Sequence, residues 1–288
     1  MSGALAAPYA MRLVALSTMH RKEKAIAPAF RQTLGSLVLA IPGINTDELG
    51  TFTGEIPRTG TMEETVRKKA RLGMRASGLR LGIASEGSFG PHPAIPFFPA
   101  GLELMIFIDD ERGFEIIESQ MSEETNYTGV LVKTLAEAEE FLKRSRFPSH
   151  KTIVASQYPR GKSFLAKGIG EKYQLIQAVK AAAKASKNGI VRIETDMRAH
   201  MNPTRMRCIR SLAAKLAKRL NTPCPKCEAP GWGVTDVEKG LPCRSCHTPT
   251  HWTARLIFSC ALCGYRRVTG RPDGKNYADE ALCPYCNP

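Results

Sequence analysis

Cys224-Pro-Lys-Cys227, Cys243-Arg-Ser-Cys246, Cys260-Ala-Leu-Cys263 and Cys283-Pro-Tyr-Cys286 are four copies of a Cys-x-x-Cys motif, and they use eight of the nine cysteines. Each motif directs two thiolates at one point, and two motifs complete a tetrahedral shell around Zn²⁺. We therefore predict two structural zinc ions, held in closed shells that leave no position for catalysis. A disulfide framework is the alternative, but no secretory signal is expected and the spacing suits metal better. The sequence leaves open which motifs pair.

Upstream of these motifs, apolar segments alternate with amphipathic ones, which predicts an α/β fold with a mixed sheet flanked by helices. We predict an α/β domain over residues 11–220, with one sheet across residues 12–220, and a tandem zinc-ribbon module over residues 221–288. The expected strands are residues 12–17, 36–41, 81–86, 102–109, 114–119, 151–155 and 190–195. The expected helices are residues 25–34, 61–76, 134–146, 171–187 and 203–220.

The net charge of +14 is concentrated in one segment. Residues 1–150 carry 17 basic and 18 acidic side chains, residues 151–220 carry 16 and 3, and residues 221–288 carry 8 and 6. Such a basic segment favours an anionic partner, either a nucleotide or a nucleic acid. No apolar run approaches the ~18 residues of a membrane span, so no membrane partner is expected. Thiols kept for metal fit a reducing cytoplasm, which is the predicted location.

A polar turn over residues 18–24 separates the first expected strand from the first expected helix. This arrangement places a helix N-terminus, with its unpaired N–H groups, beside a possible anion. We predict that Thr18, His20, Lys22 and Lys24 bind phosphate there, the alternative being a solvated loop. Glu86 ends a later apolar strand, where open α/β sheets bind ligands. Glu64 belongs to the capping box Thr61-Met-Glu-Glu64 that opens the next helix.

A second polar cluster follows the strand at residues 190–195. It contains the predicted catalytic residue Asp196 and the predicted phosphate-binding residues Arg198, His200, Asn202 and Arg205. Asn202 and the proline after it are a favoured N-cap and first residue of a helix. Arg205 falls within the apolar stripe of that helix, so it needs an inward partner, which is Glu194, Asp196 or a bound anion. The alternative is an ion-pair cluster with a structural role.

Parts of the sequence resemble known families. Ser17-Thr18 with Lys22 and Lys24, then Glu63-Glu64 with Lys68-Lys69-Ala70, then Ile83-Ala-Ser-Glu-Gly87 follow the order seen in inosine/xanthosine triphosphate pyrophosphatases. This resemblance covers residues 12–120 and implies a Mg²⁺-binding carboxylate after a strand. Nearly the whole chain resembles a bacterial family of uncharacterised proteins, through residues 84–93, 194–206 and 283–288. That resemblance implies no activity.

Together these patterns predict a Mg²⁺-dependent hydrolase of a nucleotide or related phosphoanhydride. Glu86, with Glu64 or Asp196, is expected to hold the metal, while Lys22, Lys24, Arg198 and Arg205 neutralise phosphate charge. One alternative is a nucleic-acid-binding zinc-ribbon protein without catalysis. Another is a scaffold whose ribbons contact other proteins.

Overall fold

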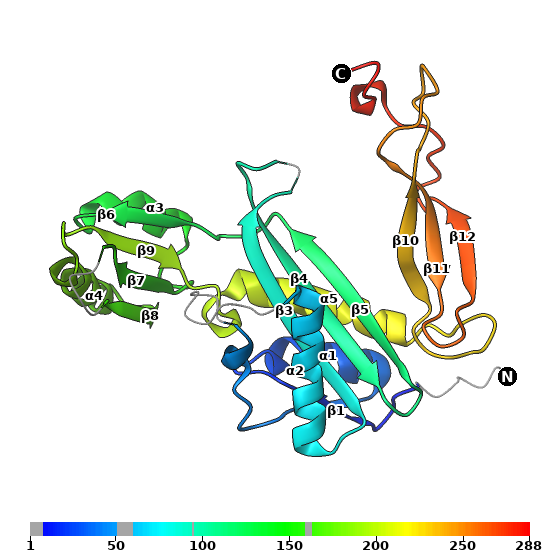
Figure 1. The fold of residues 1–288 in the computed structure, drawn as a ribbon, viewed down its shortest axis with the longest axis horizontal. Helices are drawn as coiled ribbons and strands as arrows, with labels where there is room; N and C mark the ends of the chain where they lie inside the picture. The colour runs from blue at the N-terminus through cyan, green and yellow to red at the C-terminus, as the bar shows by residue number, and fades with distance from the viewer. Residues whose placement is uncertain (1–7, 51–59, 94, 159–162) are drawn as a thin grey trace.

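The strands of this protein form three separate sheets (Figure 1). The computed structural model describes residues 8–50, 60–93, 95–158 and 163–288. Within these residues the sheets contain five, four and three strands. The α/β fold with helices beside a mixed sheet is confirmed, and so is a separate cysteine-rich module at the C-terminus. Within the residues described, no helix is both long and apolar enough to cross a membrane.

The first sheet has the strand order β2-β1-β3-β4-β5. Its strands are β1 (Leu13–Leu16), β2 (Leu37–Ala40), β3 (Leu81–Pro91), β4 (Pro99–Asp109) and β5 (Phe114–Ser122). β1 runs parallel to β2 and β3, while β3, β4 and β5 form an antiparallel meander. β1 pairs with β3 only as far as Leu16 opposite Ile83. The second half of β3 therefore extends beyond β1 and leaves a gap at the end of the shorter strand.

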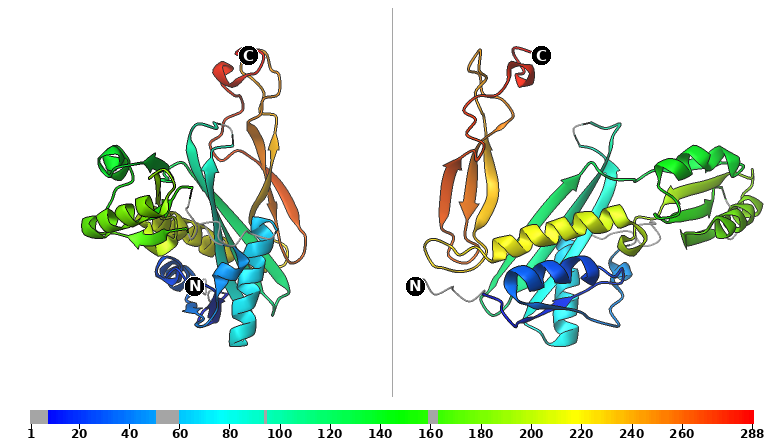
Figure 2. Two further views of the ribbon diagram at one scale, coloured as in Figure 1. Left: turned by 60° about the vertical axis from the view of Figure 1, so that its left-hand side comes forward. Right: turned by 180° about the vertical axis from the view of Figure 1, so that it is seen from behind.

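Helices cover both faces of this sheet. Along β3 and β4 successive side chains alternate between the faces: Ile83 and Met105 pack toward α1 (Glu23–Leu34) and α5 (Pro203–Leu220). Ala84 and Ile106 pack toward α2 (Met62–Ser77) on the other face. Figure 1 shows α2 in front of the sheet. In the rear view of Figure 2, α1 and α5 lie in front, so they cover the opposite face.

The second sheet is antiparallel, with the order β6-β9-β7-β8. Its elements are β6 (Gly129–Val132), α3 (Glu139–Arg144), β7 (Thr152–Ser156), β8 (Leu165–Ile169), α4 (Lys172–Ala185) and β9 (Val191–Thr195). These elements enclose a hydrophobic core of their own. The single sheet expected across residues 12–220 is therefore wrong. β9 pairs with β6 and β7, and the chain returns to the first core with Ala199 and then α5, whose apolar stripe packs there.

The third sheet is formed by β10 (Gly233–Lys239), β11 (Thr253–Ser259) and β12 (Arg266–Gly270), all antiparallel. It follows directly from the C-terminal end of α5 (Figure 2). Arg219, in the last turn of α5, joins the two parts. Its Nη1 donates to Glu118 Oε1 on β5 at 2.7 Å, and its Nε donates to the carbonyl of Gly231 at 3.1 Å.

Local signals located several helix starts correctly. Thr61 and Glu64 form the expected capping box of α2, and the Asn202 side chain accepts from the N–H of Arg205 at the start of α5. The helix expected over residues 134–146 is shorter, because α3 begins only after the 3₁₀ turn Ala136–Ala138 and ends at Arg144. The strands β6 and β8 were missed, since both are short and partly exposed.

Candidate functional site

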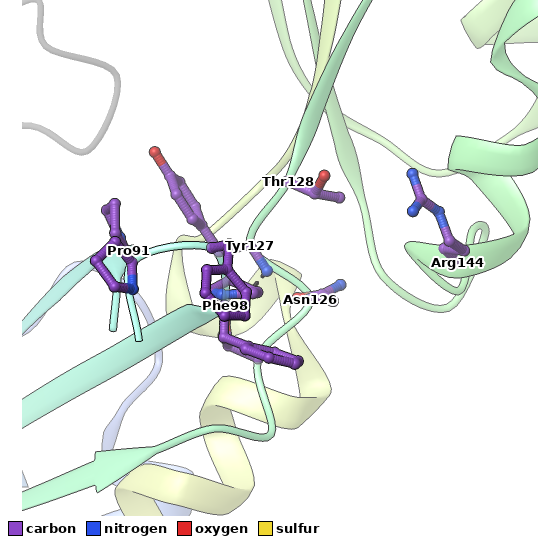
Figure 3. Close-up of a pocket in the computed structure, with 11 residues that line it drawn as sticks. Pro91, Phe98, Asn126, Tyr127, Thr128 and Arg144 are labelled. Carbon is purple, nitrogen blue, oxygen red and sulfur yellow. Dashed lines mark hydrogen bonds between the residues drawn. The ribbon is translucent and has the colours of Figure 1, made fainter. Parts of the chain in front are cut away.

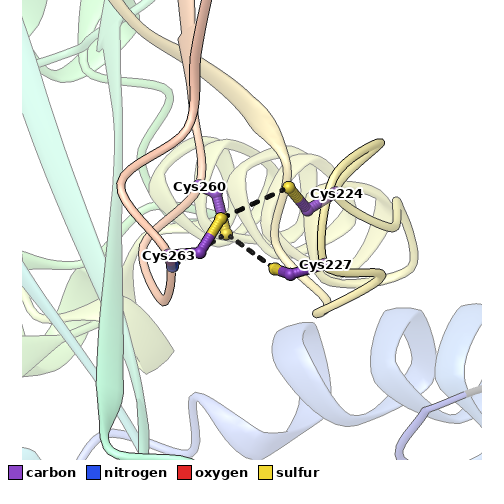
Figure 4. Close-up of side chains that lie close together, drawn as sticks. All are labelled: Cys224, Cys227, Cys260 and Cys263. Atoms are coloured by element: carbon purple, nitrogen blue, oxygen red, sulfur yellow. Dashed lines mark hydrogen bonds between the residues drawn. The ribbon is translucent and has the colours of Figure 1, made fainter.

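The eight paired cysteines form two groups, each with four Sγ atoms within 4.8 Å of one another. The first group contains Cys224, Cys227, Cys260 and Cys263 (Figure 4). Its Sγ atoms lie 3.9 Å apart between Cys224 and Cys263, and 3.7 Å apart between Cys227 and Cys260. A tetrahedral Zn–S bond of about 2.3 Å places sulfur atoms about 3.8 Å apart. The residues therefore fit a Zn²⁺ ion without rearrangement.

The second group contains Cys243, Cys246, Cys283 and Cys286. Cys243 and Cys286 have Sγ atoms 3.8 Å apart, and Cys246 and Cys283 have theirs 3.5 Å apart. Hydrogen bonds from Thr248 lower the pKa of Cys246, while hydrogen bonding to Cys246 raises that of Cys286.

The motifs pair alternately along the chain, the first with the third and the second with the fourth. The first group lies at the end of the three-stranded sheet where β10 begins and β11 ends. The second lies beyond the opposite end of the sheet, where Cys243 and Cys246 follow β10 and Cys283 and Cys286 follow β12. Cys224 and Cys260 pack with Trp232 and Tyr265, whose rings stack at 5.5 Å. These aromatic rings therefore belong to the small core of the module. Two closed groups of four cysteines support two structural zinc ions.

A crevice lies at the end of β1, beside the part of β3 that extends past it. Its walls come from the turn after β1, the 3₁₀ turn at Thr46–Leu49, α2 and β3. Lys22 crosses this gap, and its Nζ donates to the carbonyl of Ser85 at 2.8 Å and to Ser85 Oγ at 3.0 Å. Thr18 organises the turn by accepting from the N–H of His20 at 3.1 Å. The predicted polar turn is thus built around a buried lysine.

Two buried ion pairs flank Lys22, one on each face of β3 and β4. On the α2 face, Lys69 Nζ lies 2.6 Å from Glu86 Oε2. On the α5 face, Arg205 Nε lies 2.6 Å from Glu103 Oε1. All four residues are buried.

Gly87 lies directly opposite Glu103 in the β3–β4 ladder. A Cβ atom at Gly87 would lie 2.5 Å from Arg205 Nη2 and 2.6 Å from Glu103 Oε1. A glycine is therefore required for the guanidinium group to lie against the strand. The Arg205 guanidinium also lies 5.1 Å from the centroid of the Phe89 ring and donates to the carbonyl of Met197.

The charges around Lys22 leave one cation in excess. Three buried cations, Lys22, Lys69 and Arg205, face two buried carboxylates, Glu86 and Glu103. Burial, and then the charge of Arg205, lower the pKa of Lys22 to about 7. Within the described parts of the chain, no carboxylate oxygen lies within 4.0 Å of Lys22 Nζ. The half-buried Asp47 adds a carboxylate to the lining of the crevice, so an anion entering it would meet one lysine, Lys22, that is not paired with a carboxylate.

His20 connects the crevice to the second polar cluster. Its ring stacks on that of His200, with centroids 5.2 Å apart. Burial, followed by the charges of Lys22 and His200, lowers the pKa of His20 to about 3, so this ring is neutral. Burial also lowers the pKa of His200, whose buried Nδ1 has no hydrogen-bond partner among the described residues. The two sets of residues identified in the sequence therefore meet at this stacked pair.

The remaining predicted residues lie apart from this centre. Asp196 pairs with Arg198, whose Nη2 lies 2.6 Å from Asp196 Oδ2. Asp196 Oδ2 also accepts from the N–H of Gly168 on β8. Glu64 serves the capping box and is exposed, and Lys24 is exposed on α1. In the residues that the structure covers, only the two cysteine groups bring three or more metal-ligating side chains together. Glu64, Glu86 and Asp196 do not form one metal site.

Two carboxylates of this region were missed. Glu103 is the buried partner of Arg205, in place of the expected Glu194 or Asp196, but in the sequence it is one acidic residue in a strand. Asp47 lines the crevice together with Glu86. Its position after Asn45 and Thr46 indicates only a turn.

The crevice is nearly closed, with a volume of about 10 Å³. A cavity needs roughly 10–15 Å³ to hold one water molecule. A much larger groove of about 450 Å³ lies where the tip of the β3–β4 hairpin faces the segment before β6 (Figure 3). Pro91, Phe98 and Tyr127 form one side and Arg144 lies farther along it. None of the predicted site residues lines this groove.

A family model described as "Domain of unknown function (DUF6671)" matches residues 69–288. The chain belongs to the DUF6671 family. The matched region includes Glu86, Glu103, Arg205 and all eight paired cysteines, while Lys22 and His20 precede it. No curated protein and no solved structure matches the chain. Membership of an uncharacterised family is confirmed, and the resemblance to inosine/xanthosine triphosphate pyrophosphatases stays a prediction.

Proposed function

We propose that the crevice at the end of β1 binds the phosphates of a nucleotide or a related phosphoanhydride and that the protein hydrolyses it. The observation that carries this proposal is the buried ammonium group of Lys22, which among the described residues bonds only the neutral acceptors of Ser85. Its position at the end of β1, beside a longer β3, is where open α/β sheets bind ligands. The zinc module has a structural role in this proposal.

The hydrogen bonds of Lys22 indicate how a phosphate enters. The closed crevice has no room for a phosphate. Lys22 must therefore break its hydrogen bonds to Ser85 and form new ones to the ligand. The proton of Lys22 titrates near pH 7, and a phosphate beside it would hold the lysine in its charged form. Phosphate binding should therefore take up a proton at pH values above about 7.

Two carboxylates, Glu86 and Asp47, line the crevice. Mg²⁺ is commonly held by one or two carboxylates together with substrate phosphates, so this pair suits it. Mg²⁺ would supply electrostatic stabilisation to the phosphoryl oxygens. For Glu86 to bind Mg²⁺, its ion pair with Lys69 must break. The ammonium group of Lys69 is then free to contact the substrate phosphate.

The test compares Lys22→Met with Lys24→Met, since Lys24 is an exposed lysine two residues away. Nucleoside triphosphates are tested for binding and turnover with and without Mg²⁺. We expect Lys22→Met to weaken binding about 10-fold to 150-fold, the effect of removing a charge-assisted hydrogen bond of about 1.5–3 kcal/mol. We expect Lys24→Met to match the parent, and Glu86→Gln to lose the Mg²⁺-dependent turnover. A parent protein that neither binds nor hydrolyses any triphosphate would disprove the proposal.

A further inference from the structure

The five-stranded sheet and the four-stranded sheet, each with its helices, form two α/β units. A second basic cluster lies between these units, centred on the hydroxyl of Thr204. Three side chains converge on Thr204 Oγ1. Arg146 Nη1 and Arg207 Nη2 each donate to it at 3.2 Å, and His150 Nε2 lies 2.9 Å away. Arg146 follows α3, His150 precedes β7 and Arg207 lies on α5, so the cluster exists only when the units are docked.

The hydrogen bonds assign one arrangement of protons. Thr204 Oγ1 accepts from both arginines, and its own proton is donated to His150 Nε2. His150 Nε2 also accepts from the N–H of Thr204 at 3.3 Å, so the ring proton is on Nδ1, which lies 3.0 Å from Ser149 Oγ. His150 is therefore neutral. Thr204 and His150 are both buried, and they form the base of the cluster.

The two arginines bring like charges to one neutral oxygen. Among residues 8–50, 60–93, 95–158 and 163–288, no carboxylate oxygen lies within 4.0 Å of either guanidinium group. Both arginines are exposed, so a ligand can reach them from solvent. Two convergent guanidinium groups match the oxygens of a tetrahedral anion, because each has N–H donors beyond the one used on Thr204.

We propose that Arg146, Arg207 and Thr204 form a second phosphate-binding site, at the junction between the two α/β units. The neutral state of His150 is consistent with it, since burial and then the charges of Arg146 and Arg207 lower the pKa of this ring. The site is independent of the crevice at Lys22. Its phosphate is either a free phosphate or nucleotide, or the backbone of a nucleic acid, which would use the surrounding basic segment as well.

The experiment measures binding of three probes to the full chain: inorganic phosphate, adenosine monophosphate and a short single-stranded RNA. The variants are Arg146→Gln and Arg207→Gln, with Arg210→Gln as the control, since Arg210 is an exposed arginine on the same helix. Thr204→Val removes the shared hydroxyl and Thr204→Ser retains it. Each variant is also made on the Lys22→Met background, so that the crevice does not contribute to binding, and melting temperatures verify that each variant is folded.

On the Lys22→Met background we expect Arg146→Gln and Arg207→Gln each to weaken binding at least about tenfold, with Arg210→Gln and Thr204→Ser close to that background. The binding affinity of Thr204→Val should lie between those of the arginine variants and of Thr204→Ser. If the arginine variants lose binding of the RNA alone, the phosphate belongs to a nucleic-acid backbone. If they lose binding of inorganic phosphate or adenosine monophosphate, the ligand is a small molecule. The proposal is overturned if the parent binds none of the probes. It is equally overturned if the Lys22→Met background no longer binds any probe, or if Arg210→Gln weakens binding as much as Arg146→Gln does.

Discussion

Arg205 and Glu103 form an ion pair that is almost fully removed from solvent, with Nε 2.6 Å from Oε1 and both side chains at most 2% exposed. The pair joins α5 to β4. Arg205 also donates to the carbonyl of Met197, in the segment that leads into α5, and the pair lies against Gly87 on the adjacent strand β3. It is therefore the polar contact that positions the start of α5 on the first sheet. Three testable predictions concern this contact and the groups beside it, and a fourth concerns the cysteine motifs.

Arg205→Lys should destabilise the protein even though the charge is kept. Lysine cannot reproduce the planar fork that bonds Glu103 and Met197 together. We expect a loss of about 1.5–3 kcal/mol in the free energy of unfolding, the value of hydrogen bonds to charged groups. Urea unfolding measures this loss. Because the guanidinium is already paired within the protein, affinity for phosphate at Lys22 should be nearly unchanged. A variant that unfolds like the parent would contradict the structural role.

Gly87→Ala should also destabilise this contact, and Gly90→Ala is its matched control. The new Cβ at Gly87 meets Arg205 and Glu103 at under 3.0 Å, whereas nothing lies within 4 Å of a Cβ at Gly90 on the same strand. Overpacking of this kind costs about 1–3 kcal/mol. Differential scanning calorimetry should show a lower melting temperature for Gly87→Ala only. Equal effects of the two changes would mean that the pair tolerates displacement.

The pH dependence of stability should report on Lys22. The unfolded chain keeps the lysine proton up to the ordinary pKa of 10.5, while the folded protein loses it near pH 7. Between these values unfolding takes up a proton, so this lysine makes stability rise with pH. Lys22→Met removes the effect. It should stabilise the protein most at or below pH 7, and the advantage should shrink toward pH 10. Lys24→Met should show no such trend, and a pH-independent difference for Lys22→Met would refute the shifted pKa.

Double cysteine variants should establish how the motifs pair. Cys227→Ser with Cys263→Ser disrupts only the first group, so one zinc per chain should remain. Cys227→Ser with Cys246→Ser disrupts both groups and should leave none. Consecutive pairing of the motifs predicts the reverse result, so zinc content by mass spectrometry distinguishes the two arrangements. Because zinc supplies much of the folding energy of such modules, hydrogen exchange should increase across β10–β12 and much less in β1–β5.

Patterns that depend on neighbours in the chain were read correctly from the sequence. The eight zinc ligands, the capping box at Thr61 and the N-cap at Asn202 were all identified. So was the inward direction of Arg205, because its position in the helical period decides the face on which it lies. In each case the physical cause acts within one turn or one motif, so residue type and spacing are sufficient.

Only the tertiary structure decided which distant groups meet. Arg205 pairs with Glu103, 102 positions away, and the Sγ atoms of Cys224 and Cys263 meet across 39 positions. The division into two sheets and the convergence of Arg146 and Arg207 on Thr204 are of the same kind. Such contacts depend on how whole elements dock. That docking is set by the shapes of the apolar cores, which place α5 on the first sheet and β9 in the second.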